Sequence, residues 1–152
     1  MNKQLYIITG APNMRKSSVI RALTGVRDTR TFTLQFEIDR VNTHVMVTSP
    51  NEISSNVFPN GIGIHSLIEL LSNLNETAII LPLRSISPRF NLPVASDYIQ
   101  ALLNAGFEIA PVIMFNEPIA LPNGIEGEFL VSNENIPSNL TASKVRKIWE
   151  II

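Results

Sequence analysis

The chain contains no cysteine, so it has neither a disulfide framework nor a thiolate metal site. Charged residues make up only 16% and the net charge is −1, which gives no electrostatic reason to expect nucleic acid or an anionic membrane as partner. The longest apolar runs are far shorter than a membrane span requires. The first residues lead almost directly into a strand pattern, without the three regions of a signal peptide. We therefore expect a cytoplasmic protein.

Apolar side chains, by contrast, are abundant. They make up 45% of the sequence, which argues against disorder and for a compact core. A length of 152 residues is sufficient for one domain with a sizeable core. We therefore predict a single domain over residues 1–152.

Strand and helix patterns alternate along the chain. Residues 31–39 alternate between apolar and polar, and after a turn around residues 40–42 the Val-rich residues 43–48 predict the second strand of an antiparallel hairpin. The other predicted strands are residues 5–8, 78–83, 107–115 and 128–131, and the predicted helices follow residue 10, residue 63, residue 92 and residue 140. This order predicts an α/β fold, a three-layer α/β/α sandwich whose mainly parallel sheet carries one antiparallel edge hairpin.

Several helix ends have recognisable signals. Ser66 and Glu69 have the spacing of a capping box, and Thr141 is predicted to cap the last helix. In that last helix, Trp149 and Ile152 are expected on the face that packs into the core. The ligand crevice of such a sheet is expected at the carboxyl ends of its strands.

A phosphate-loop pattern follows the first predicted strand. Gly10, Lys16 and Ser17 have the spacing of G-x-x-x-x-G-K-[ST], in which backbone N–H groups cradle phosphates, the lysine reaches the outer phosphates and the hydroxyl ligates Mg²⁺. The second glycine of the pattern is replaced by Arg15. Its side chain is expected to crowd the nucleotide, and the alternative is that the guanidinium swings out and pairs with phosphate.

The surrounding segment GAPNMRKSSVIRALTG resembles the first motif of the translation-factor-related GTPases of the Era, Der and Obg type, which commonly read G-x-P-N-V-G-K-S-[ST]-L-x-N-A-L-T-G. The resemblance implies a P-loop NTPase-like fold. It also implies GTP or ATP with Mg²⁺ as a weakly bound cofactor, if any is bound, with Ser17 on the metal. The phosphate-binding residues that it implies are Gly10, Asn13, Arg15, Lys16, Ser17 and Ser18.

The later motifs of that family have been lost. Alignment places Val47 on the metal-binding aspartate of D-x-x-G and Pro50 on its glycine, and neither residue can take over the role. Of the guanine-reading N-K-x-D, only Asn116 survives, and Ile119 stands at the aspartate. The expected S-A-K is Ser132-Asn133-Glu134. Each lost charge-assisted contact costs about 1.5–3 kcal/mol, so three losses would weaken a nanomolar site to micromolar or beyond.

No other acid stands clearly in place of the missing aspartate. Asp28, Asp39 and Asp97 do not end a buried strand. Glu52 is the nearest carboxylate to the predicted site, and its position in a polar loop predicts a solvated residue. His44 and His65 do not form a metal spacing with nearby acids.

These observations favour a degenerate GTPase-like protein that acts as a non-catalytic binding or assembly module, with a protein partner or self-association and weak or no nucleotide binding. The first alternative is an active small P-loop phosphotransferase or NTPase with a rebuilt site that uses Arg15, Arg84 and Arg89. The second is a purely structural protein in which Lys16 has no ligand.

Overall fold

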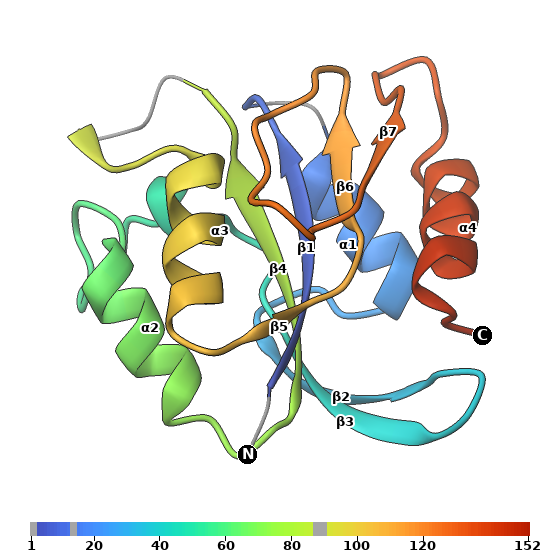
Figure 1. Cartoon of the computed structure of the whole chain (residues 1–152). Helices are drawn as coiled ribbons and strands as arrows, with labels where there is room; N and C mark the ends of the chain where they lie inside the picture. The colour runs from blue at the N-terminus through green and yellow to red at the C-terminus, as the bar shows by residue number, and fades with distance from the viewer. Residues whose placement is uncertain (1–2, 13–14, 87–90) are drawn as a thin grey trace.

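The computed structural model describes residues 3–12, 15–86 and 91–152 and has a mixed α/β architecture (Figure 1). Its strands are β1 (Gln4–Gly10), β2 (Arg30–Gln35), β3 (Arg40–Val45), β4 (Ala78–Arg84), β5 (Glu108–Ile109), β6 (Val112–Phe115) and β7 (Gly127–Leu130). Its helices are α1 (Lys16–Thr24), the short 3₁₀ helix η1 (Pro50–Glu52), α2 (Ile64–Ser72), α3 (Ala95–Asn104) and α4 (Ser138–Trp149).

The seven strands form one mostly parallel sheet in the order β2-β3-β4-β1-β6-β7, with β5 also paired to β1. β1 lies in the interior, parallel to β4 on one side and to β5 and β6 on the other. The apolar runs of β1, β4 and β6 fit this position, because an interior parallel strand is covered on both faces. β2 pairs antiparallel with β3 at the edge of the sheet, so the predictions of a mainly parallel sheet and of an edge hairpin are confirmed.

Helices pack on both faces of the sheet (Figure 1). On one face, Val19 of α1 and Val145 and Trp149 of α4 are buried against Ile8 of β1. On the other face, α2 and α3 cover the sheet, and Tyr98 of α3 donates its hydroxyl to the Ile62 carbonyl at 2.6 Å. None of the helices within the described ranges combines the length and the apolar character needed to cross a membrane.

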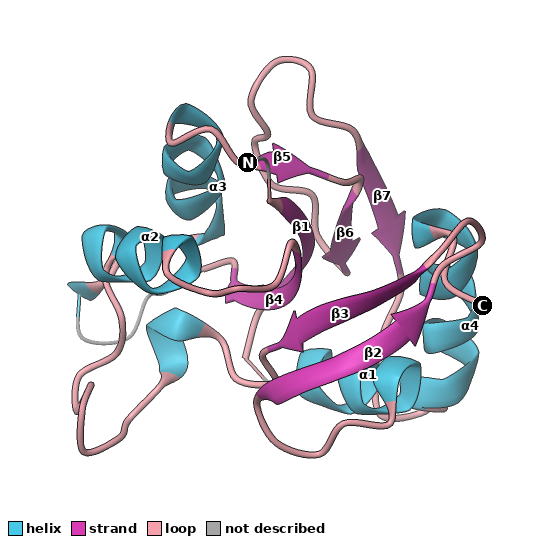
Figure 2. Ribbon diagram, turned by 90° about the horizontal axis from the view of Figure 1, so that it is seen from below, coloured by secondary structure: helices cyan, strands magenta, loops and turns pink. Residues whose placement is uncertain are grey.

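The hairpin turn lies earlier than the alternating pattern predicted. β2 ends at Gln35 and β3 begins at Arg40, so the predicted turn at residues 40–42 is wrong. The N–H of Phe36 donates to the Asp39 carbonyl at 2.8 Å, and Phe36 forms a bridge with Ile151 near the C-terminus. β2 and β3 lie side by side up to this turn (Figure 2). The apolar alternation continues past the end of β2 because Phe36 packs in the core, whereas Ile38 in the turn is 86% exposed.

Two predicted helix caps are also wrong. α2 begins at Ile64, so Ser66 already lies within its first turn and is not a cap. α4 begins at Ser138, directly after Pro137, and Thr141 lies inside the helix with its side chain buried. Glu150 then adopts a left-handed φ of 59°, which ends the helix and exposes Ile152, contrary to its predicted core position. A capping residue marks the start of a helix only when the residues before it are not helical. Here a glycine directly precedes α2 and a proline directly precedes α4, so both helices begin before the predicted caps.

The predicted strand over residues 107–115 is divided into β5 and β6 at Pro111. Proline has no N–H to donate to a neighbouring strand, so the ladder cannot continue through it. Its carbonyl instead accepts a hydrogen bond from Nε1 of Trp149 at 2.8 Å. The Trp149 ring also makes an edge contact with Tyr6, at a ring-centroid distance of 5.3 Å. The predicted core position of Trp149 is confirmed, and the contact joins α4 to the sheet.

We expect Trp149→Phe to lower the free energy of unfolding by about 1–3 kcal/mol, because it leaves the Pro111 carbonyl without this donor and creates a void. Urea unfolding followed by far-UV circular dichroism measures the change. Leu140→Ala is the control, since Leu140 lies on the same helix and is 55% exposed. Its effect should stay within about 0.5 kcal/mol. Equal losses in the two variants would mean that the Trp149 contact does not anchor α4.

Candidate functional site

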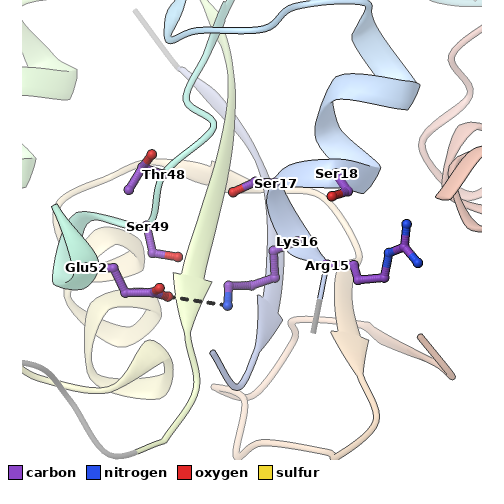
Figure 3. A pocket seen from close by; sticks show the side chains of 7 residues that line it. All are labelled: Arg15, Lys16, Ser17, Ser18, Thr48, Ser49 and Glu52. Atoms are coloured by element: carbon purple, nitrogen blue, oxygen red, sulfur yellow. Dashed lines mark ion pairs between the residues drawn. The ribbon is translucent and has the colours of Figure 1, made fainter. Parts of the chain in front are cut away.

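A cavity of about 360 Å³ opens at the carboxyl ends of the strands, beside the first turn of α1 (Figure 3). Its lining combines residues after β1 with residues after β3, which agrees with the crevice expected from the strand order. The lining residues are Arg15, Lys16, Ser17, Ser18, Thr48, Ser49 and Glu52. The first four of these were predicted as phosphate-binding residues, and the structure brings them together.

Arg15 has a left-handed backbone conformation, with φ 65° and ψ 24°, immediately before α1. Glycine adopts this conformation without strain, and glycine is the residue of the phosphate-loop pattern at this position. The guanidinium donates to the carbonyl of Glu134 at 3.1 Å, and Figure 3 shows the side chain pointing away from Lys16 and Glu52. The side chain is therefore turned outward at the rim of the cavity, and the expectation that it crowds a nucleotide stays a prediction. The direction of the guanidinium agrees with the alternative expectation that it swings out, although it binds a backbone carbonyl here and not a phosphate.

Lys16 is buried, with only 6% of its side chain exposed. Its Nζ donates to the Ala11 carbonyl at 3.0 Å and lies 3.3 Å from Oε1 of Glu52. Burial lowers the pKa of the Lys16 ammonium below its usual value, the Glu52 carboxylate opposes that shift, and the positive charge of Arg84 adds to it. The pocket therefore contains a partly desolvated lysine whose charged form is stabilised by Glu52.

Ser17, predicted as a magnesium ligand, donates its hydroxyl to the carbonyl of Val47. This hydrogen bond joins the first turn of α1 to the segment after β3. Magnesium prefers carboxylate oxygens, and the carboxylate in the cavity lining is paired with Lys16. No group of three or more histidine or acidic side chains with metal-ligand spacing occurs in the described residues. These donors fit Mg²⁺ poorly.

Glu52 was predicted to be a solvated loop residue, and this prediction is wrong. It lies at the end of η1, where its N–H donates to the Ser49 carbonyl at 2.8 Å, and its side chain turns toward Lys16 (Figure 3). The neighbouring Asn51, which sequence reasoning missed, is fully buried. Its Nδ2 donates to the carbonyls of Arg84 and Pro93, and its Oδ1 accepts from the Arg84 N–H. The Pro-Asn start of this short helix was the available signal.

The remaining predicted residues have other surroundings. Gly10 ends β1, and its carbonyl accepts from the Ser85 N–H at 3.0 Å. Arg84 ends β4 with its Nε bonded to the Ile86 carbonyl at 3.1 Å, outside the cavity lining. The side-chain amide of Asn116 accepts from the Ser132 N–H and donates to the Ser132 carbonyl, so it joins the segments after β6 and β7. Asn13 and Arg89 lie outside the described residues.

Comparison with protein-family models gives no match, and comparisons with curated proteins and with solved structures give none either.

We expect Glu52→Gln to lower the pKa of Lys16 further, because the substitution removes the charge that opposes the effect of burial. An NMR titration of the lysine Cε resonances at alkaline pH measures this shift. Glu69→Gln is the control, since Glu69 is an exposed residue on α2 that lies near His65 and not near Lys16. An unchanged Lys16 titration in Glu52→Gln would show that the ion pair does not form in solution.

Proposed function

We propose that this chain is a degenerate P-loop protein of the GTPase-like type that binds phosphate groups weakly and does not turn over nucleotide. It serves as a binding or assembly module, through a protein partner or through self-association. The proposal includes a three-layer P-loop arrangement, in which β1 and α1 flank the phosphate loop. GTP or ATP would be bound weakly, through the phosphates and without reading of the base.

The ion pair between Lys16 and Glu52 is the observation that carries this proposal. In the phosphate-loop pattern, the lysine is the cation that meets the outer phosphates. Here that cation faces a carboxylate from its own chain at 3.3 Å. A phosphate that enters the cavity must therefore compete with Glu52 for Lys16, which weakens its binding.

The same ion pair argues against turnover. A magnesium-dependent hydrolase or kinase needs an acid to hold the metal and a group to activate the attacking oxygen. Glu52 is the acid in the cavity lining, and its carboxylate is occupied by Lys16. Val47 presents its carbonyl to Ser17 at the point where the family motif would present a carboxylate.

A small phosphotransferase or NTPase with a rebuilt site is the second candidate, and one observation favours it. The Arg84 charge acts on the Lys16 ammonium, so a second cation lies near the cavity. A phosphate bound by Lys16 would attract the Arg84 guanidinium away from the Ile86 carbonyl. This candidate predicts turnover, whereas the first predicts none.

We expect the purified protein to hydrolyse neither ATP nor GTP above background with Mg²⁺ present, because Glu52, the acid in the described lining of the cavity, is paired with Lys16. Phosphate release during prolonged incubation measures the rate. Lys16→Met, prepared in the same way, is the control for contaminating hydrolases. Multiple turnovers in the native protein that disappear in Lys16→Met would favour the second candidate.

We expect pyrophosphate to bind the native protein weakly and to bind Glu52→Gln about three- to tenfold more tightly, because the competing carboxylate has been neutralised. Lys16→Met should abolish binding in both backgrounds. Isothermal titration calorimetry at low ionic strength measures the affinities, and Glu69→Gln is the matched control for the loss of one negative charge. No binding in either the native or the Glu52→Gln protein would contradict the phosphate-binding proposal.

A further inference from the structure

The cavity that contains Lys16 and Glu52 is called the phosphate-loop cavity below. A second, more apolar cavity lies beside it. Its volume is about 600 Å³, within the range of small-molecule sites. Its apolar lining includes Ile53, Val57, Phe58 and Leu70, and its polar lining includes His44 and Thr48. β3, the loop after η1 and helix α2 all contribute to it.

The two cavities adjoin each other. Thr48 lines both of them. Glu52 lines the phosphate-loop cavity, and the next residue, Ile53, lines the apolar cavity. A short ligand that reaches Lys16 with one end can therefore place its other end against Ile53 and the residues beyond it.

Among the described residues, the lining of this second cavity includes no lysine, arginine, aspartate or glutamate. Its one imidazole, that of His44, has a pKa lowered by burial, which favours the neutral ring. The phosphate-loop cavity, in contrast, has Arg15 and Lys16 in its lining. One end of the combined site suits an anion, and the other suits a group without charge.

We propose that the combined site binds a phosphate monoester of an apolar group, with the phosphate at Lys16 and the apolar group in the cavity between β3 and α2. The inference rests on the proposed function and adds the class of ligand. The combined site fits a nucleobase less well. Asn116, which aligns with the base-reading motif, binds the backbone of Ser132 and lies outside the linings of both cavities.

The chain length of the ligand provides the test. Each methylene that enters an apolar cavity strengthens binding roughly three- to fourfold when it is fully buried. Methyl, butyl and octyl phosphate share one headgroup and differ in that length alone. We expect octyl phosphate to bind at least tenfold more tightly than methyl phosphate, measured by calorimetry below the micelle concentration.

Variants locate the apolar end. Val57→Ser and Phe58→Ser should reduce the advantage of octyl over methyl phosphate at least threefold and leave methyl phosphate binding unchanged. Val57 is 78% exposed, so its substitution does not threaten folding. Ile38→Ser is the matched control, because Ile38 is also largely exposed, at 86%, but lies at the hairpin tip, outside both cavities. Lys16→Met should weaken all three ligands.

The outcomes separate this inference from the proposed function. Binding of pyrophosphate and methyl phosphate with no gain from chain length would overturn the inference alone. Failure of every phosphate to bind would overturn both proposals. Adenosine monophosphate binding more tightly than octyl phosphate would assign the cavity to a nucleotide, and binding to phosphatidic acid vesicles without binding of soluble octyl phosphate would assign it to a membrane surface. Either result would overturn the proposed ligand class.

Discussion

The burial of the Lys16 ammonium is the constraint on which the site depends. A charged group that is removed from water requires a partner, since an unpaired buried charge costs several kcal/mol. Glu52 supplies that partner from a separate segment of the chain, after β3. The position of Glu52 in turn depends on η1 and on Asn51, whose amide is hydrogen-bonded to the backbone on either side of the segment after β4. The cation therefore holds together loops that are far apart in the sequence.

The turn before α1 has an unusual backbone conformation for the residue that occupies it. The backbone before α1 retains the left-handed turn that glycine favours, although arginine occupies the position. Such a conformation costs a non-glycine residue about 1–2 kcal/mol, and the two hydrogen-bonded carbonyls of residues 133 and 134 offset part of it. The left-handed turn thus forms with arginine in place of glycine, and the lysine that follows it pairs with a carboxylate of the same chain.

The cover of the sheet changes near the apolar cavity. Helices α2 and α3 cover the sheet beside β1 and β4, whereas irregular chain after η1 covers the end of β3. The cavity lies at this edge, between the loop after η1 and the end of α2. Within the described residues, Glu52 directly before that loop is the acid within 4 Å of the Lys16 ammonium.

The sequence alone determined the mixed α/β class, the mainly parallel sheet, the edge hairpin and the core position of Trp149. Those features follow from local apolar periodicity, which depends on neighbours a few residues apart. It also brought Arg15, Lys16, Ser17 and Ser18 to one place, because consecutive residues at a helix start lie together in any fold. The tertiary structure decided where the hairpin turns, where α4 begins and that Pro111 divides a strand. It alone placed Glu52 against Lys16, because a contact between residues 36 positions apart leaves no periodic pattern in the chain.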